Sequence, residues 1–127
     1  MNQKTNQSNR AKGDTGENYT ALLLENEGYC VICRNYVYKG GEIDIIATKE
    51  QYLCFVEVKT RNILSGTKAS DAVDTAKLSR LKKGVDEFLR EFGNDAHICA
   101  LTPRIDIMEI YTDNGTVKIH NHITGIQ

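Results

Sequence analysis

Two neighbouring segments of the sequence carry charged side chains inside otherwise apolar strand patterns. Residues 41–46 read GEIDII, and residues 55–59 read FVEVK. Because side chains alternate along a strand, Glu42 and Asp44 should share one face and leave the other to Ile43 and Ile45. Glu57 and Lys59 should likewise share a face. If Asp44 lies opposite Phe55 or Glu57 in an antiparallel hairpin, both carboxylates and the lysine point the same way.

Adjacent carboxylates repel each other, and a divalent cation is a common reason for such an arrangement. Mg²⁺ binds through one or two carboxylates and keeps its remaining positions for water or phosphate. A lysine two residues away could hold or deprotonate a water, or face the scissile phosphate. Asp44, Glu57 and Lys59 therefore suggest phosphodiester hydrolysis. The alternative is an exposed strand face in which Glu57 and Lys59 form a surface ion pair.

Two further charged residues have both a structural and a functional interpretation. Glu17 follows Asp14 by three positions, which is typical of a helix capping box. It could instead be an additional acidic ligand in the first turn of that helix. Lys77 lies within the apolar stripe of a second helix, where a lysine usually extends toward solvent. It could also reach over the sheet toward a phosphate.

Other polar residues favour structural roles. Arg104 and Asp106 share a strand face, and we expect a structural ion pair. His120 and His122 lie near the end of an apparent edge strand, where exposed histidines without a metal are expected. The cysteines Cys30, Cys33, Cys54 and Cys99 include one C-x-x-C but no second pair, so we expect small buried hydrophobic side chains. A structural zinc site is the lesser alternative.

The apolar patterns predict a mixed sheet flanked by helices, in the α/β class. Helices are expected from Asp14 to Gly28 and from about Ser70 to Phe92. Strands are expected at 29–38, 42–48, 52–59, 105–111 and 117–121, with an apolar stretch at 97–101 and a hairpin turn at 113–115. Residues 1–12 resemble a flexible polar tail, and residues 13–127 should form one domain.

Composition excludes several classes of protein. The 127 residues contain no apolar run long enough to cross a bilayer, and the N-terminus resembles no secretory signal, so we expect a cytoplasmic protein. The net charge of −1 does not itself indicate a nucleic-acid partner. Basic residues concentrate between positions 59 and 83, namely Lys59, Arg61, Lys68, Lys77, Arg80, Lys82 and Lys83. They could form a solvated helix face or a phosphate-contacting surface.

The motifs resemble those of the YraN-like family, predicted endonuclease-related proteins similar to Holliday-junction resolvases within the PD-(D/E)XK nuclease superfamily. The most specific match is GEIDIIA at 41–47 followed by FVEVKTR at 55–61. Weaker matches are Gly16-Glu17, Gly28-Tyr29, Arg34-Asn35-Tyr36, Lys77 and Arg104-Ile105-Asp106. Ile105 departs from the usual phenylalanine, which affects packing. The resemblance implies a restriction-endonuclease-like αβββαβ core with Asp44, Glu57 and Lys59 as the motif residues, supported by Glu17 and Lys77.

These observations predict a metal-dependent endonuclease that acts on DNA and uses Mg²⁺ or Mn²⁺ as its cofactor. Branched DNA is a candidate substrate. Asp44 and Glu57 would bind the metal with the Val58 carbonyl, Glu17 would support them, and Lys59 would position the water. DNA contacts are expected from Arg61, Lys68, Lys77 and Arg80, with Glu42 and Thr60 as accessory residues. A homodimer could grip a symmetric junction. The alternative is a non-catalytic nucleic-acid-binding or scaffold protein with the same fold.

Overall fold

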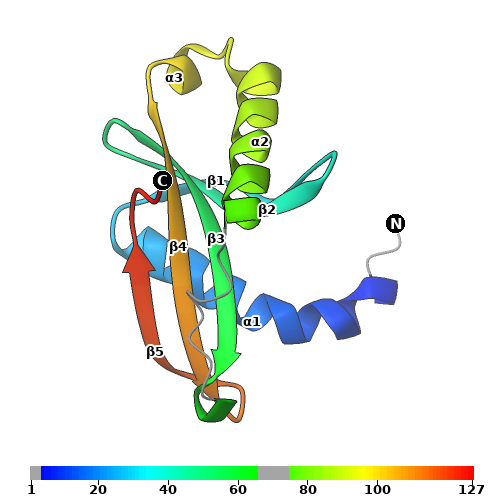
Figure 1. Ribbon diagram of the computed structural model, residues 1–127. Helices are drawn as coiled ribbons and strands as arrows, with labels where there is room; N and C mark the ends of the chain where they lie inside the picture. The colour runs from blue at the N-terminus through cyan, green and yellow to red at the C-terminus, as the bar shows by residue number, and fades with distance from the viewer. Residues whose placement is uncertain (1–3, 66–74) are drawn as a thin grey trace.

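The computed structural model describes residues 4–65 and 75–127 and forms an α/β fold around a five-stranded sheet (Figure 1). In chain order the elements are α1 (Lys4–Asn26), β1 (Cys30–Tyr38), β2 (Gly41–Lys49), β3 (Tyr52–Asn62), a 3-10 turn η1 (Ile63–Ser65), α2 (Thr75–Phe92), α3 (Ala96–Cys99), β4 (Thr102–Asp113) and β5 (Thr116–Ile123). No helix of the described chain is long and apolar enough to span a membrane.

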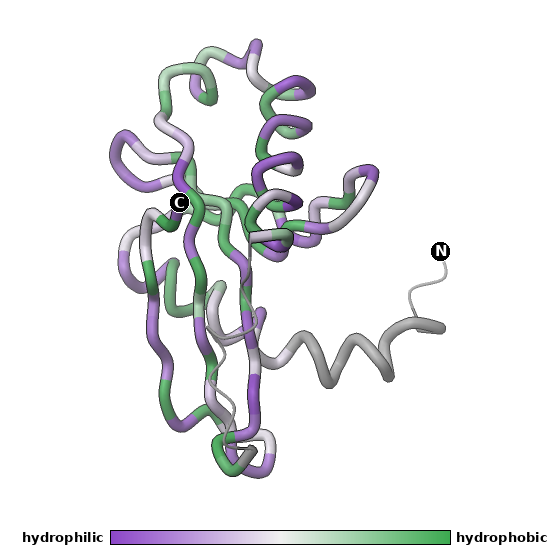
Figure 2. Tube along the Cα trace, viewed as in Figure 1, coloured by the Kyte–Doolittle hydropathy of each residue, from purple (hydrophilic) through white to green (hydrophobic). Residues whose placement is uncertain are grey.

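The sheet has the strand order β1-β2-β3-β4-β5 and mixed direction. β3 and β4 pair in parallel, whereas the other three neighbouring pairs are antiparallel. Helices cover both faces: Leu24 of α1 packs with one buried cluster, and Phe88 of α2 packs with another. Figure 2 shows hydrophobic residues recurring along the strands and α2. The predicted mixed sheet flanked by helices is therefore confirmed, with a restriction-endonuclease-like arrangement.

Turn chemistry determines the last hairpin. Asn114 and Gly115 both have positive φ, 52° and 77°, and Asp113 pairs with Thr116 on either side of them. Asparagine followed by glycine is the usual sequence for such a two-residue turn. The hairpin predicted at 113–115 is therefore confirmed.

The helix boundaries differ from the sequence prediction. The start expected at Asp14 is wrong, because α1 begins at Lys4. Residues 4–13 contain no proline, so nothing in the backbone chemistry prevents the helix from extending in this direction. The start of the second helix, expected near Ser70, lies outside the described residues. The division into a tail at 1–12 and a domain at 13–127 stays a prediction.

The predicted burial of the cysteines is only partly correct. Cys54 is fully buried, but Cys30 and Cys99 are exposed. Cys30 begins β1, which is an edge strand, and Cys99 ends the short helix α3, so both lie outside the two buried clusters. All four described cysteines are free thiols.

The alternation of side chains in the β1–β2 hairpin is interrupted at one level. Ile43 belongs to the cluster under α2, whereas Ile45 belongs to the cluster under α1, although the two residues are two positions apart. The expectation that they share a face is therefore wrong. On β1, Asn35 lies at the same level, between the pairs Tyr36↔Ile43 and Arg34↔Ile45, and has a φ of 55°. A left-handed residue rotates the strand locally, which accounts for the change of face.

The position of α2 over this hairpin depends on the absence of a side chain at Gly84. A Cβ atom there would lie 2.5 Å from a ring carbon of Tyr38 and 2.9 Å from Ile43 Cδ1. The Tyr38 hydroxyl donates a 2.6 Å hydrogen bond to the Arg80 carbonyl, one turn earlier in α2. These contacts fix the first half of α2 against β1 and β2, and Lys77 lies in that half.

Candidate active site

Asp44 lies where β2 separates from β3. The last antiparallel pair between these strands is Ile45↔Val56, so the next position on β2 is Asp44 and the next on β3 is Glu57. The Val58 amide donates a 2.8 Å hydrogen bond to Asp44 Oδ2. The aspartate side chain therefore replaces a backbone acceptor at the end of the β2–β3 ladder, and its carboxylate is held at the border of the two strands.

Glu57 keeps the regular alternation of β3. Phe55, two positions earlier, packs under α2, whereas Val56 and Val58 pack on the α1 side. Glu57 and Lys59 therefore share one face, as predicted, and this face is the α2 side. Glu57 is 6% exposed. Its Oε1 atom lies 3.4 Å from Lys59 Nζ and 3.3 Å from Lys77 Nζ. No described donor reaches Oε2, which is also buried.

Electrostatics at this point favour proton uptake by Asp44. Burial, then the charge of Glu57, raise the pKa of Asp44 to about 7, and Glu17 and Glu42 add to the shift. The Val58 hydrogen bond opposes the change without overcoming it. Burial also lowers the pKa of Lys59, although Glu57 opposes that change. Both changes move the pKa of the side chain toward neutral pH, as is common for groups at catalytic sites.

Glu17 approaches the same place from the α1 side. Gly16 allows this approach, because a Cβ atom at Gly16 would clash with the Thr60 hydroxyl. Glu17 Oε1 lies 3.9 Å from Arg34 Nη2. With its amide nitrogen turned toward the carboxylates, Asn35 donates to Glu17 Oε1 at 2.9 Å and to Glu42 Oε1 at 2.7 Å.

Arg34 and Asn35 were not predicted from the sequence to belong to the site. Their contacts depend on the left-handed conformation of Asn35 and on the packing of α1 against the hairpin. Asparagine is enriched in that conformation, so an asparagine within a strand pattern was the available signal. Its two acidic partners could not be identified from sequence spacing.

The donors present fit a hard divalent cation that shares its coordination with water or phosphate. Within residues 4–65 and 75–127, no group of three His, Cys, Asp or Glu side chains is placed to hold a metal ion. The two central carboxylates, Asp44 and Glu57, nonetheless match the one or two that Mg²⁺ commonly takes from proteins. The unpaired Glu57 Oε2 and the raised pKa of Asp44 show negative charge that the described residues compensate only in part.

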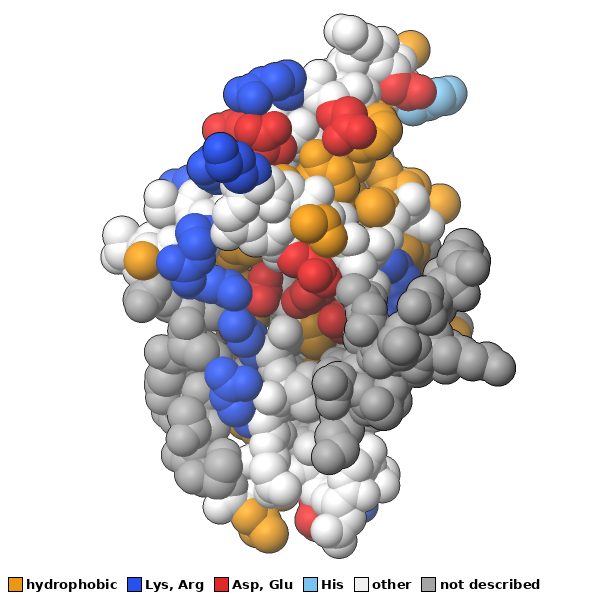
Figure 3. Space-filling view, turned by 90° about the vertical axis from the view of Figure 1, so that its right-hand side faces the viewer, with side chains coloured by type: hydrophobic (Ala, Val, Ile, Leu, Met, Phe, Trp, Pro, Cys, Tyr) orange, Lys and Arg blue, Asp and Glu red, His pale blue; other side chains and the backbone are white. Residues whose placement is uncertain are grey.

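The predicted DNA-contacting residues occupy different environments. Lys77 reaches into the site and contacts Glu57. Arg61 is half-buried and donates to the Thr60 carbonyl, whereas Arg80 is exposed on α2. Lys68 lies outside the described residues. Figure 3 shows acidic side chains gathered at the middle of one face, beside a line of lysine and arginine side chains.

Arg104 and Asp106 form a separate cluster on the α1 side of β4. Arg104 binds both oxygens of Asp106 at 2.9 Å, which confirms the predicted ion pair. His122 Nε2 lies 2.8 Å from Asp106 Oδ2. His122 is therefore not exposed as expected, because β5 pairs it with Met108, beside the buried Asp106. His120 is exposed but contacts the Tyr19 hydroxyl through Nδ1 at 2.8 Å.

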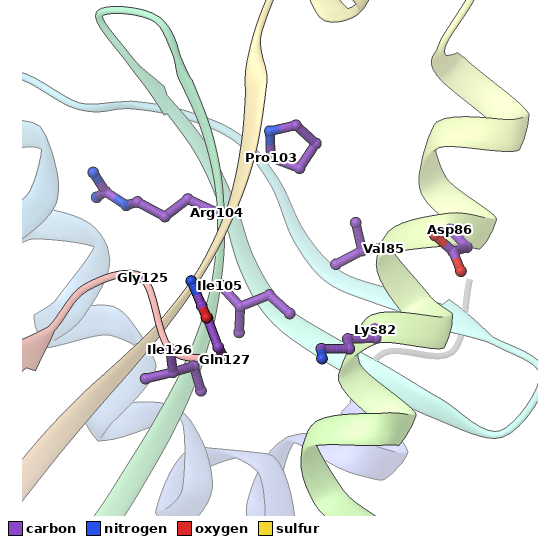
Figure 4. A pocket seen from close by; sticks show the side chains of 9 residues that line it. All are labelled: Lys82, Val85, Asp86, Pro103, Arg104, Ile105, Gly125, Ile126 and Gln127. Carbon is purple, nitrogen blue, oxygen red and sulfur yellow. The ribbon is translucent and has the colours of Figure 1, made fainter.

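A cavity of about 420 Å³ lies on the other side of β4, between α2 and the C-terminal segment. Arg104, Ile105, Lys82 and Val85 are among the residues that line it (Figure 4). None of the predicted catalytic residues contributes to its walls. The candidate active site is therefore the cluster of Asp44 on β2 with Glu57 and Lys59 on β3.

Comparison with known proteins places the chain in a family. The model of "Uncharacterised protein family UPF0102" matches residues 16–110, which include every predicted catalytic residue. A UPF0102 protein of Chlorobium phaeobacteroides is 40% identical over 98 residues, covering 77% of this chain and 74% of the relative. One from Flavobacterium johnsoniae is 36% identical over 116 residues, covering 88% and 89%. One from Bacteroides thetaiotaomicron is 35% identical over 111 residues, covering 87% of each chain. The chain therefore belongs to the UPF0102 family, which is the YraN-like family that its GEID and FVEVKTR motifs resemble.

Proposed function

We propose that this protein is an endonuclease that hydrolyses DNA phosphodiester bonds with Mg²⁺ or Mn²⁺. The observation that carries the proposal is the placement of Asp44 beside Glu57, with Lys59 on the same face of β3. A buried carboxylate oxygen without a described donor adds support, because a buried charge is costly unless a partner compensates it.

Each residue has a distinct role in the proposed reaction. Asp44 and Glu57 would hold the cation, and the Val58 carbonyl would be a third oxygen ligand. A bound Mg²⁺ or Mn²⁺ would polarise the phosphate and lower the pKa of a water molecule. Lys59 would orient that water and balance negative charge on the phosphate. Glu17 would support the cation-binding carboxylates from the α1 side.

Basic residues beside the site would position the DNA backbone. Lys77 is anchored on α2 and already reaches the Glu57 carboxylate, so it could contact a phosphate placed over the site. Arg61 lies two residues beyond Lys59 on the same strand face, and Arg80 is exposed one turn along α2. Contacts of this kind fix the register of DNA without reading its sequence. A homodimer would present two such sites to branched DNA.

The proposal is tested by cleavage of linear, flapped and four-way-junction DNA in Mn²⁺ and in EDTA. Glu57→Gln and Lys59→Met should each reduce the Mn²⁺-dependent rate by on the order of 100-fold. The first removes a carboxylate that would hold the cation, and the second removes the positive charge beside the reacting phosphate. Glu87→Gln is a matched control, since Glu87 is a carboxylate of α2 whose ion pair is with Arg90 of the same helix. It should leave the rate unchanged.

Two outcomes would overturn the proposal. If Glu57→Gln and Lys59→Met cut DNA as fast as the parent protein, the cleavage does not arise at this site. If the parent binds DNA with a steep salt dependence but cuts none of the substrates, the protein is a nucleic-acid-binding member of the fold.

A further inference from the structure

A second buried carboxylate faces the same side of the sheet as the candidate site. Glu109 on β4 is 5% exposed, and no residue that the structure describes forms a hydrogen bond with its Oε2 atom. Across the described residues, the buried side-chain atoms that lack a partner are Glu57 Oε2 and Glu109 Oε2. The packing of the sheet alone does not explain why these two glutamates are buried, because glutamate is rarely buried without a compensating charge.

Lys59 is a neighbour of both glutamates, since it contacts Glu57 and pairs in register with Glu109. β3 and β4 run parallel, and their register places Lys59 directly beside Glu109. The same register pairs Phe55 with Ile105, both of which pack on the α2 side, so Glu109 faces that side as well. Neighbouring strands lie about 4.8 Å apart, so a lysine and a glutamate paired in this way can bring their charged groups together.

In this structure Lys59 does not use that neighbour. Its ammonium group contacts Glu57 Oε1 at 3.4 Å, an oxygen it shares with Lys77. Among the described residues, Glu109 receives a single hydrogen bond, of 3.0 Å, from the neutral amide of Asn121 on β5. Two ammonium groups thus share one oxygen of Glu57, while Glu109 forms no ion pair with any residue that the structure describes.

We propose that Glu109 is a positioning residue that receives the Lys59 ammonium when Glu57 binds a divalent cation. This inference rests on the proposed function. Once a cation balances the charge of Glu57, an ammonium group held against the same oxygen would be repelled. Glu109 offers that group a free oxygen on the neighbouring strand and keeps it on the face where the phosphate would bind.

The test is Mn²⁺ affinity, measured by isothermal titration calorimetry on the DNA-free full chain. Glu109→Gln is compared with the parent, and the same substitution is then made together with Lys59→Met. With Lys59 present, we expect Glu109→Gln to weaken Mn²⁺ binding by about 5- to 10-fold, because the displaced ammonium group loses its acceptor. With methionine at position 59, the substitution should change the affinity less than 2-fold.

Further variants separate this effect from a loss of folding. Glu109→Asp keeps the charge and should recover part of the affinity lost in Glu109→Gln. Glu87→Gln removes a carboxylate of α2 outside the site and should bind Mn²⁺ as the parent does. Thermal unfolding of every variant establishes that the titrated protein is folded.

The possible results are distinct. An equal loss of affinity with lysine and with methionine at position 59 would overturn the role of Glu109, and so would no loss with lysine. If the folded parent binds no Mn²⁺, the proposed metal-dependent function fails and this inference fails with it. If Glu109→Gln does not fold, Glu109→Asp alone decides: unchanged affinity and an unchanged response to Lys59→Met would overturn the proposal.

Discussion

Asp44 on β2 and Asp106 on β4 are both enclosed aspartates of the central sheet, but their surroundings differ. Asp106 is fully buried and receives hydrogen bonds from Arg104, the Gly125 amide and His122. Within the described part of the chain, Asp44 receives one hydrogen bond, from the Val58 amide. Burial raises the pKa of both carboxyls, yet the pKa of Asp106 is lowered overall while that of Asp44 rises to about 7.

The difference shows that the partners of a buried acid, more than its burial, indicate its role. At Asp106, the guanidinium of Arg104 balances the charge, and the remaining acceptor positions are occupied by groups from β5 and the C-terminal segment. At Asp44, the nearby charges that shift its pKa are other carboxylates. A closed network stabilises the fold, whereas an open one leaves coordination for a ligand.

The largest effect on stability is expected from Asp106→Asn. The substitution keeps the shape of the side chain but leaves Arg104 without its charge partner, so the free energy of unfolding at pH 7 should fall by about 3–5 kcal/mol. Urea unfolding measures this loss. Mn²⁺ affinity of the remaining folded protein should equal that of the parent. A loss below about 1 kcal/mol would show that the cluster is not the closed network described here.

Asp44→Asn should have the opposite effect and raise the free energy of unfolding. A carboxyl whose folded pKa lies near 7 holds its proton more tightly in the folded state, so ionising it costs stability as pH rises from about 4 to 7. Asparagine can still accept the Val58 hydrogen bond but cannot ionise. We expect the variant to be more stable than the parent at pH 8 by about 1–3 kcal/mol, with little difference at pH 4.

Urea unfolding of both proteins at the two pH values checks this prediction. Asp106→Asn provides the comparison, since a lowered pKa contributes stability that is present above about pH 4 and is lost as pH falls through the folded pKa. If Asp44→Asn also destabilised the protein at pH 8, the two aspartates would be equivalent structural groups and the comparison would fail.

The site could be predicted from the sequence only where side chains alternate regularly along a strand. The placement of Glu57 and Lys59 followed from simple alternation, which β3 obeys. The proximity of Asp44 was also predicted, but the face assigned to its neighbour Ile43 was wrong. The change of face at Asn35 is a property of one backbone torsion, which residue type favours without specifying.

Contacts between strands that are distant in the sequence could not be predicted from it. His122 was predicted to be exposed because its partner Asp106 lies on another strand, and the register between strands is set by packing. Glu109 was overlooked for the same reason, because its neighbour Lys59 is identified only by the parallel pairing of β3 and β4. The fold class required less information, since the order and type of the elements already restrict the ways in which a sheet can be covered.

The smallest effect in this comparison concerns Asn35, which binds Glu17 and Glu42, two carboxylates that act on Asp44. Asn35→Gly removes the amide but tolerates the positive φ, so it separates the hydrogen bonds from the backbone conformation. If these carboxylates support the cation site, loss of their shared donor should weaken Mn²⁺ binding by about 10-fold. Asn114→Gly is the matched control, because Asn114 has a similar φ in the β4–β5 turn.

Calorimetric titration of both variants with Mn²⁺ gives the answer, and chemical unfolding reports the stability that each loses. Equal affinities for Asn35→Gly and Asn114→Gly would make Asn35 a turn residue only, with no influence on the site. A loss confined to Asn35→Gly would show that the open network around Asp44 extends to a donor on β1. The irregular backbone that breaks the strand pattern would then serve to bring acids from α1 and β2 to one place.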